Sequence, residues 1–201
     1  MKKTLAVLAL LAVVVAGAAA QTYYGIGVGM QTTTAHLLAD GKLKTTAIAL
    51  NVDTVVGNTI CVVFSSSISM PNRLAVYNSD GSLYNEGALG SHIDIRFGAD
   101  MLAALAYRFV FGQAELLVGA GAGINLLQLM SSTEVSGFQF MNFGFGGFAT
   151  AAINLSPNFQ LYGGVRYLYA PEILIATRME GTGFSVATTF TPHVGLKIRT
   201  R

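Results

Sequence analysis

Ser91, His92 and Asp94 form the one local group in this sequence whose residue types could support hydrolysis. A serine nucleophile, a histidine base and an acid that orients the base are the parts that such chemistry requires. The residues around them alternate between polar and apolar, which predicts an extended strand. Because successive side chains of a strand point to opposite faces, Ser91 and His92 diverge. We therefore predict no catalytic residues here.

The histidines and glycines form no metal or cofactor signature. His36, His92 and His193 lie far apart, and no His-x3-His or carboxylate spacing marks a metal site. The glycine repeat at 119–123 lies inside an alternating run, whereas a dinucleotide-binding glycine loop joins a strand to a helix. We predict no metal and no cofactor. Cys61 is the single cysteine, so no internal disulfide can form.

These groups lie in or beside the most regular part of the chain, from His92 to Met130, where two long alternating runs meet at Gly112-Gln113. One face of the two runs is apolar and comprises Ile93, Ile95, Phe97, Ala99, Met101, Ala103, Leu105, Tyr107, Phe109, Leu116, Val118, Ala120, Ala122, Ile124 and Leu126. A period of two marks a β-strand. Both runs exceed the roughly five or six residues usual in soluble sheets. We predict a hairpin whose apolar face meets lipid.

Six further stretches alternate in the same way, at 23–33, 44–56, 60–68, 141–155, 159–169 and 184–199. With the hairpin they make eight strands. Because eight is an even number, the first strand begins and the last strand ends at the same end of the sheet. The connections after the second, fourth and sixth strands are short, and those at 34–43, 71–91, 131–137 and 170–183 are longer. We also predict a bulge at Gly146-Gly147, and a three-residue loop that pairs Leu155 with Phe159.

The first twenty residues predict export. A basic start at Lys2 and Lys3, an apolar stretch at 5–15 and small residues at 18–20 are typical of a signal peptide cleaved after Ala20. Residues 21–201 then form the barrel. Without Lys2 and Lys3 the chain carries ten basic and ten acidic residues, which argues against a nucleic-acid partner.

The composition favours a membrane protein whose β-strands, and not helices, cross the membrane. Charged residues make up 11% of the chain, against about 25% in soluble domains. Hydrophobic residues reach 52%, yet no run after residue 20 gives the roughly 18 uncharged apolar residues of a transmembrane helix. A chain with these two properties is typical of a transmembrane β-barrel.

The signal peptide, the eight alternating strands and the short turns opposite longer loops resemble small outer-membrane proteins of the OmpA/OmpX type, the outer membrane protein beta-barrel domain. The resemblance covers essentially all of 21–201. It implies an all-β, eight-stranded antiparallel up-and-down transmembrane β-barrel in the cell outer membrane. It also implies contact with outer-membrane lipids, and with the barrel-assembly machinery and periplasmic chaperones during biogenesis. We expect a monomer.

The inner faces of the predicted strands carry the charged residues Asp94, Arg96, Asp100, Arg108, Glu115, Arg166, His193 and Lys197. An eight-stranded barrel has room for side chains and little else. We therefore expect these charges to pair across a lumen plugged by side chains, with Arg108 diagonal to Glu115. Inner glycines such as Gly25 and Gly27 would leave room for long arginines or, in the alternative, open a narrow cavity.

Four functions are compatible with this barrel. The first is a structural or surface-contact role, with an extracellular ligand bound through the loop at 71–91. The second is a narrow conduit for small or hydrophobic solutes, like barrels of the OmpW type. The third is a lipid A-modifying enzyme that uses Ser91, His92 and Asp94. The fourth, a soluble lipocalin-like barrel, inverts the faces and would expose Arg96 and Arg108.

Overall fold

The structure is a computed structural model that describes residues 21–37, 41–88, 95–130, 137–177 and 184–200. These residues form nine strands: β1 (Thr22–Leu37), β2 (Lys42–Gly57), β3 (Ile60–Tyr77), β4 (Leu83–Ala88), β5 (Ile95–Phe111), β6 (Ala114–Met130), β7 (Gly137–Ser156), β8 (Phe159–Thr177) and β9 (Phe184–Thr200). None of the described residues belongs to a helix long and apolar enough to cross a membrane. The predicted signal peptide, 1–20, lies outside the described residues.

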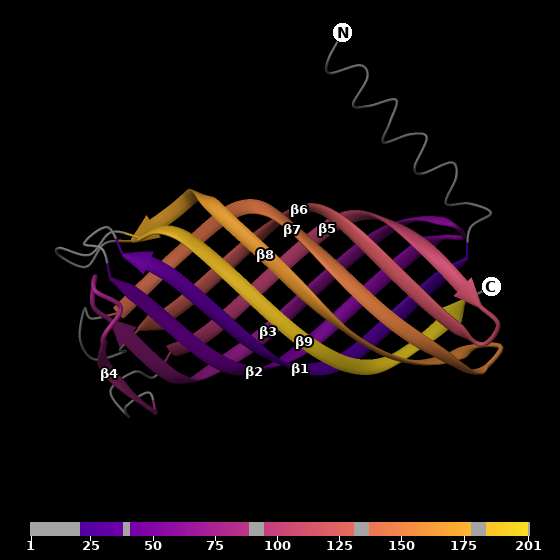
Figure 1. Cartoon of the computed structure of the whole chain (residues 1–201), viewed down its shortest axis with the longest axis horizontal. Coiled ribbons are helices and arrows are strands. Elements are labelled where there is room, and N and C mark those ends of the chain that lie inside the picture. The colour runs from indigo at the N-terminus through magenta and orange to yellow at the C-terminus, as the bar shows by residue number, and fades with distance from the viewer. Residues whose placement is uncertain (1–20, 38–40, 89–94, 131–136, 178–183, 201) are drawn as a thin grey trace, which may run out of the picture.

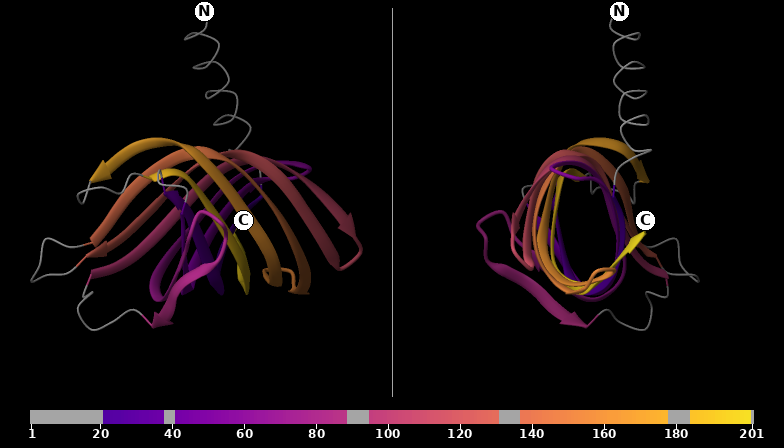
Figure 2. Two further views of the ribbon diagram at one scale, coloured as in Figure 1. Left: turned by 60° about the vertical axis from the view of Figure 1, so that its left-hand side comes forward. Right: turned by 90° about the vertical axis from the view of Figure 1, so that its right-hand side faces the viewer.

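Eight of the nine strands close into an antiparallel ring (Figure 1). Within the ring, strands that follow one another along the chain pair, β3 pairs with β5 across the excursion to β4, and β1 pairs with β9. The short β4 pairs only with β3 and stands outside the ring. Seen nearly along its axis, the ring is oval (Figure 2). The predicted fold class, an eight-stranded antiparallel β-barrel, is confirmed.

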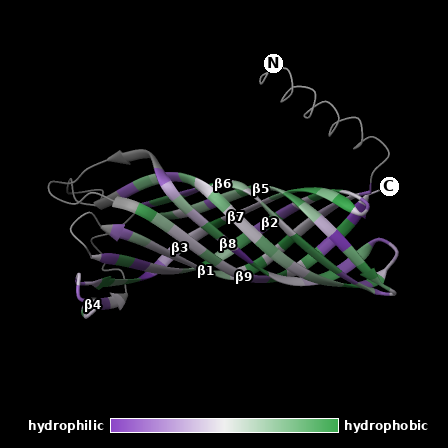
Figure 3. Cartoon of the chain, turned by 45° about the horizontal axis from the view of Figure 1, so that its top comes forward, coloured by the Kyte–Doolittle hydropathy of each residue, from purple (hydrophilic) through white to green (hydrophobic). Residues whose placement is uncertain are grey.

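Side chains alternate between the outside and the inside of the ring, as the period of two predicts. Leu105 is 62% exposed and Tyr107 48% exposed on the outer face, whereas Arg108 is 7% exposed inside. Hydrophobic and hydrophilic segments accordingly alternate along the strands (Figure 3). This arrangement contradicts the inverted, lipocalin-like alternative, which required the aliphatic row to be buried and Arg108 to be exposed.

The two ends of the barrel differ. At the turn end, β1 begins where β9 ends, since Thr22 pairs with Thr200, and short turns join β2 to β3, β5 to β6 and β7 to β8. Two of these turns use glycines with positive φ, Gly57 (132°) and Gly112 (64°), which favour residues without a Cβ atom. The opposite end, the loop end, carries the longer connections. The predicted asymmetry is confirmed.

The predicted loop at 71–91 is largely a second hairpin. Strand β3 continues to Tyr77, past a register shift opposite Thr46 and Ala47, and β4 pairs back onto it. The tight turn between them is held by Ser82, whose backbone N–H donates to the Asp80 carboxylate over 2.8 Å. Hydrogen bonds from Ser82 also lower the pKa of Asp80. The prediction of a long loop at 71–91 was wrong for 71–77 and 83–88, because Asn72, Asn85 and Gly87 lie within the strands and only residues 78–82 form the turn.

Two predicted details of β7 are wrong. Its register shifts against β8 lie between Met141 and Asn142, between Phe143 and Phe145, and between Asn154 and Ser156. Gly146 pairs regularly with both Gly121 and Leu168, so there is no bulge at Gly146-Gly147. Its missing side chain instead makes room for Leu102, whose Cδ1 would lie 3.2 Å from a Cβ atom at position 146. The predicted pairing of Leu155 with Phe159 is also wrong, because Ser156 takes that place and shortens the turn.

The inner glycines accommodate aromatic rings and leucines. A Cβ atom on Gly25 or Gly27 would lie 3.2 or 3.0 Å from the Tyr162 hydroxyl oxygen, and one on Gly195 would lie 2.8 Å from the Tyr162 ring. Tyr162 is 2% exposed, and Lys197 Nζ lies 4.3 Å from its ring centroid. The expectation that these glycines make room for arginines is therefore corrected, since the ring of Tyr162 occupies the space.

We predict that Gly27→Ala destabilises the barrel by about 1–3 kcal/mol, because the added methyl group overpacks the interior. Its Cβ atom would lie 2.6 Å from the Val194 carbonyl oxygen, a backbone atom that cannot turn aside. Urea titration of the refolded protein, followed by heat-modifiable gel mobility, measures the change. Gly87→Ala in β4 is the control, since no atom lies within 4 Å of its added Cβ. Equal unfolding midpoints for the two variants would contradict the packing argument.

Candidate functional site

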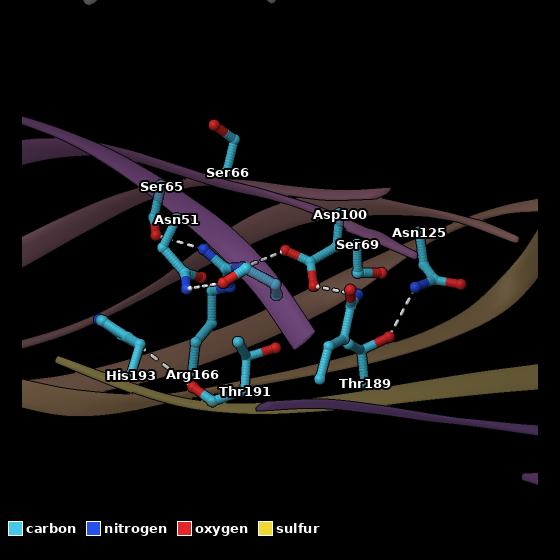
Figure 4. Close-up of polar contacts among 12 residues, drawn as sticks. Asn51, Ser65, Ser66, Ser69, Asp100, Asn125, Arg166, Thr189, Thr191 and His193 are labelled. Carbon is cyan, nitrogen blue, oxygen red and sulfur yellow. Dashed lines mark hydrogen bonds and ion pairs between the residues drawn. The ribbon is translucent and has the colours of Figure 1, made fainter. Parts of the chain in front are cut away.

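The centre of the barrel holds an ion pair between Arg166 of β8 and Asp100 of β5, which stand on walls separated by β6 and β7 (Figure 4). Their side chains are 2% and 1% exposed. The Arg166 guanidinium also donates to the Ser65 hydroxyl of β3. A buried charge is tolerated when an opposite charge and hydrogen bonds compensate for its lost hydration. Arg166 therefore joins three strands through the lumen.

Further polar groups extend this pair into a network. Gln31 Nε2 donates to Asp100 Oδ2 over 2.9 Å, and Ser65 Oγ donates to Asp53 Oδ1 over 2.5 Å. His193 Nε2 lies 3.9 Å from Asp53 Oδ2, and its Nδ1 lies 3.1 Å from the Thr191 carbonyl oxygen. With Arg166, these residues come from β1, β2, β3, β5, β8 and β9. We call them the central network.

An apolar layer lies between the central network and the loop end. Asn125 Nδ2 donates to Thr189 Oγ1 over 2.6 Å, and the next inward positions toward the loop end are apolar. They form a cluster of side chains exposed by at most 1%, and we call it the apolar collar: Ala35, Leu43, Leu127, Leu129, Phe140 and Ala187, with Leu74 packed against it. Each of these residues lies near the loop end of its strand.

A second polar cluster lines the lumen at the turn end. Glu115 Oε1 accepts a hydrogen bond of 2.9 Å from Gln160 Nε2, and Glu115 Oε2 lies 3.6 Å from Arg108 Nε. The Arg108 guanidinium also lies 4.6 Å from the centroid of the Tyr23 ring. The predicted diagonal contact between Arg108 and Glu115 is confirmed.

Open space enters the barrel from the turn end. A cavity of about 580 Å³ reaches Tyr23, Arg108 and Glu115. A void of about 10 Å³ shares those three residues and borders a second void of similar volume, which is lined by Asp53 and His193. Each void is close to the size of one water molecule. Water-sized spaces thus lie between the cavity at the turn end and the central network.

The described residues do not assemble a hydrolytic or metal site. Ser65 and His193 both contact Asp53 rather than each other, so the histidine is not placed to accept the serine proton. No group of three or more His, Cys, Asp or Glu side chains within the described ranges could hold a metal ion. The predicted group at 91–94 lies outside the described residues.

The alternation of side chains along each predicted strand correctly placed most of the charged residues on the inner face. Seven of the eight residues predicted on the inner faces lie buried or half-buried at inward positions: Arg96, which pairs with the collar residue Leu129, and Asp100, Arg108, Glu115, Arg166, His193 and Lys197. Asp94 lies outside the described residues. Sequence reasoning missed the contributions of Gln31, Asp53 and Ser65, although their parity had already placed them on inner faces.

No protein-family model and no curated protein matches this sequence. Its fold is similar to two solved outer-membrane barrels. Neisserial surface protein A matches with a TM-score of 0.57 and 13% identity, over 89% of this chain and 97% of that chain. The outer membrane protein OprG from Pseudomonas aeruginosa matches with a TM-score of 0.55 and 12% identity, over 91% and 97%. The chain therefore has the fold of small eight-stranded outer-membrane barrels.

We predict that Arg166→Met lowers the free energy of unfolding by about 3–5 kcal/mol, because it leaves the Asp100 carboxylate buried without a cation. Combining it with Asp100→Asn removes that charge, so the double variant loses less than the sum of the two single variants. Urea unfolding in lipid vesicles measures all three. The exposed Arg73→Met is the control and stays within about 0.5 kcal/mol of wild type. Strictly additive losses would show that the pair does not couple.

Proposed function

We propose that this protein is an integral outer-membrane β-barrel with a closed lumen and a surface-contact role at its loop end. The distribution of side chains carries the proposal, since aliphatic and aromatic residues cover the outside while the Arg166–Asp100 pair lies inside. Lipid solvates such an outer face, and water does not. The likeness in fold to a neisserial surface protein and to OprG supports the same location.

Export and assembly follow from this location. The segment at 1–20 directs the chain across the inner membrane and is removed after Ala20. Periplasmic chaperones and the barrel-assembly machinery then handle 21–201, because the exposed apolar strands aggregate in water. Since the barrel pairs every strand within one chain, it needs no second subunit and works as a monomer among outer-membrane lipids.

The apolar collar closes the lumen in this proposal. Its side chains give the lumen an apolar lining there, and hydrophobic constrictions exclude water and ions. The cavity and voids on the other side make the turn-end half a blind, hydrated pocket. The barrier to conduction is therefore the collar, and the central network contributes mainly to stability.

A narrow conduit is the second candidate. The observation that favours it is the series of spaces from the cavity at Arg108 and Glu115 to the void at Asp53 and His193, which covers much of the route through the barrel. Conduction along this route requires the collar to open. The two candidates therefore differ in one measurable property, the conductance of the wild-type barrel.

The hairpin of β3 and β4 is the proposed contact surface, in place of the long loop expected at 71–91. It leans away from the barrel at the loop end (Figure 2). Leu83 is 50% exposed and Tyr84 73% exposed on it. Exposed apolar and aromatic side chains on a loop-end hairpin are suited to binding an extracellular ligand. The third candidate, a lipid A-modifying enzyme, would be excluded by an unchanged lipid A mass on overexpression.

We predict that the protein appears in the outer-membrane fraction as a species that begins at Gln21. N-terminal sequencing and intact mass identify the cleavage site. The folded species migrates differently on a gel before and after boiling, because a closed barrel resists unfolding by detergent. Recovery of the processed protein in the soluble fraction without detergent would contradict the membrane assignment.

We predict that the wild-type barrel shows no discrete openings in a planar bilayer, and that Leu129→Ala with Phe140→Ala introduces them. Both side chains are fully buried in the collar, so their truncation widens the constriction. Arg166→Met with Asp100→Asn leaves the collar intact and should stay closed.

Leu126→Ala with Phe145→Ala is the matched control, because it removes similar side chains from the outer face of the same strands. Discrete openings of the wild-type barrel would favour the conduit. A closed Leu129/Phe140 variant that retains folded gel mobility would show that the collar is not the barrier.

A further inference from the structure

Three exposed cations gather on the outer face of the barrel near the loop end. Lys42 and Lys44 lie at the start of β2, and Arg73 lies toward the end of β3. His36, near the end of β1, is half-buried on the same face. We call these four residues the basic patch. Strand parity places them on the side that bears the aliphatic residues, and hence outside the lumen.

The register of β1, β2 and β3 brings the four side chains within reach of one another. Lys42 pairs directly with His36 on β1, and Lys44 follows it two residues later on the same face. Arg73 pairs with Thr46, so it is a diagonal neighbour of Lys44. Paired and diagonal neighbours on one face lie roughly 5–8 Å apart. Side chains as long as lysine and arginine can therefore converge on one anion.

The basic patch begins where the apolar surface of the same strands ends. On that face, Met30 of β1 is 56% exposed, Ile48 of β2 is 69% exposed and Met70 of β3 is 70% exposed. The cations lie three to six residues further toward the loop end, or about 10–20 Å along a strand. In a membrane-spanning barrel this level is that of the polar lipid headgroups.

The positive charge of the patch is not neutralised by ion pairs of the described residues. The ion pairs among the described residues join Arg108 to Glu115, Arg166 to Asp100 and His193 to Asp53, and all three lie inside the barrel. On the outer side, the exposed Glu86 of β4 pairs with Ala75, which in turn pairs with Lys44. Among the described residues of these strands, one carboxylate beside three cations leaves the patch positive.

We infer that the basic patch binds the phosphate groups of a phosphorylated lipid in the outer leaflet. This inference rests on the membrane orientation given under the proposed function. Arginine binds phosphate with paired N–H donors and lysine adds point charges, so Arg73, Lys42 and Lys44 suit a headgroup with two phosphates. The apolar side chains of Met30 and Ile48 lie where the acyl chains of the same lipid would pack. A soluble anion would gain nothing from that apolar surface, which is why a lipid is the occupant.

Native mass spectrometry of the folded barrel in neutral detergent tests this inference with bis-phosphorylated lipid A, dephosphorylated lipid A and inorganic pyrophosphate. We expect wild type to prefer the bis-phosphorylated lipid over the dephosphorylated one by about tenfold or more, since each basic residue at a membrane surface adds about fivefold. The variant Lys42→Gln/Lys44→Gln/Arg73→Gln should lose this preference. Glu86→Gln should strengthen it, because it removes the neighbouring negative charge.

Arg199→Gln, at the turn end, is the matched control and should keep the wild-type preference. An unchanged preference in the triple variant would overturn the inference, and so would pyrophosphate binding as tightly as the lipid. If the triple variant does not fold, the salt dependence of wild-type binding decides, because a preference that persists undiminished at high salt is not electrostatic.

Heat-modifiable mobility and insertion into vesicles are measured before the binding experiment, to show that each variant is folded. Failure of wild type to insert would contradict the proposed function, whereas insertion without phosphate preference contradicts this inference alone.

Discussion

The closure of the ring through the ladder between β2 and β3 is the constraint on which the rest of the structure depends. In hydrocarbon no water is available to pair a backbone N–H or C=O group, so an open sheet edge is costly and a closed ring avoids it. Closure also divides the side chains into those facing outward and those facing a narrow lumen. The strand that does not join the ring, β4, lies at the loop end, beyond the apolar face.

Closure around eight strands leaves an interior in which polar side chains must satisfy one another. The barrel meets this requirement unequally along its length. Its turn-end half is polar and contains a cavity and water-sized voids, and the central network joins six strands. Its loop-end half contains the apolar collar. The polar half, with its cavity and voids, and the apolar half of the lumen are therefore distinct along the barrel axis.

The outer surface at the loop end combines a basic patch with a protruding hairpin, and the apolar parts of the strands have neither. The basic patch on β1, β2 and β3 lies on the loop-end side of their exposed apolar residues. The hairpin of β3 and β4 leans outward at the same end of the barrel (Figures 1 and 2). A headgroup bound at the patch would contact the wall from which this hairpin departs. In the two proposals, lipid and extracellular ligand would thus be bound at neighbouring positions at one end of the barrel.

Periodicity alone determined the eight strands, the inward or outward direction of nearly every side chain, and the short turns opposite longer loops, because these features depend on residues adjacent in the chain. It also placed Arg166 and Asp100 inside. Only the tertiary structure decided that these two residues pair, that Tyr162 fills the space left by inner glycines, and that apolar side chains pack together in the loop-end half. Contacts across the lumen depend on the register accumulated over several ladders and on side-chain length, and neither is encoded in the alternation of a single strand. The β3–β4 hairpin was missed for a related reason: its turn residues resemble those of an irregular loop, and its pairing depends on where β3 leaves the ring.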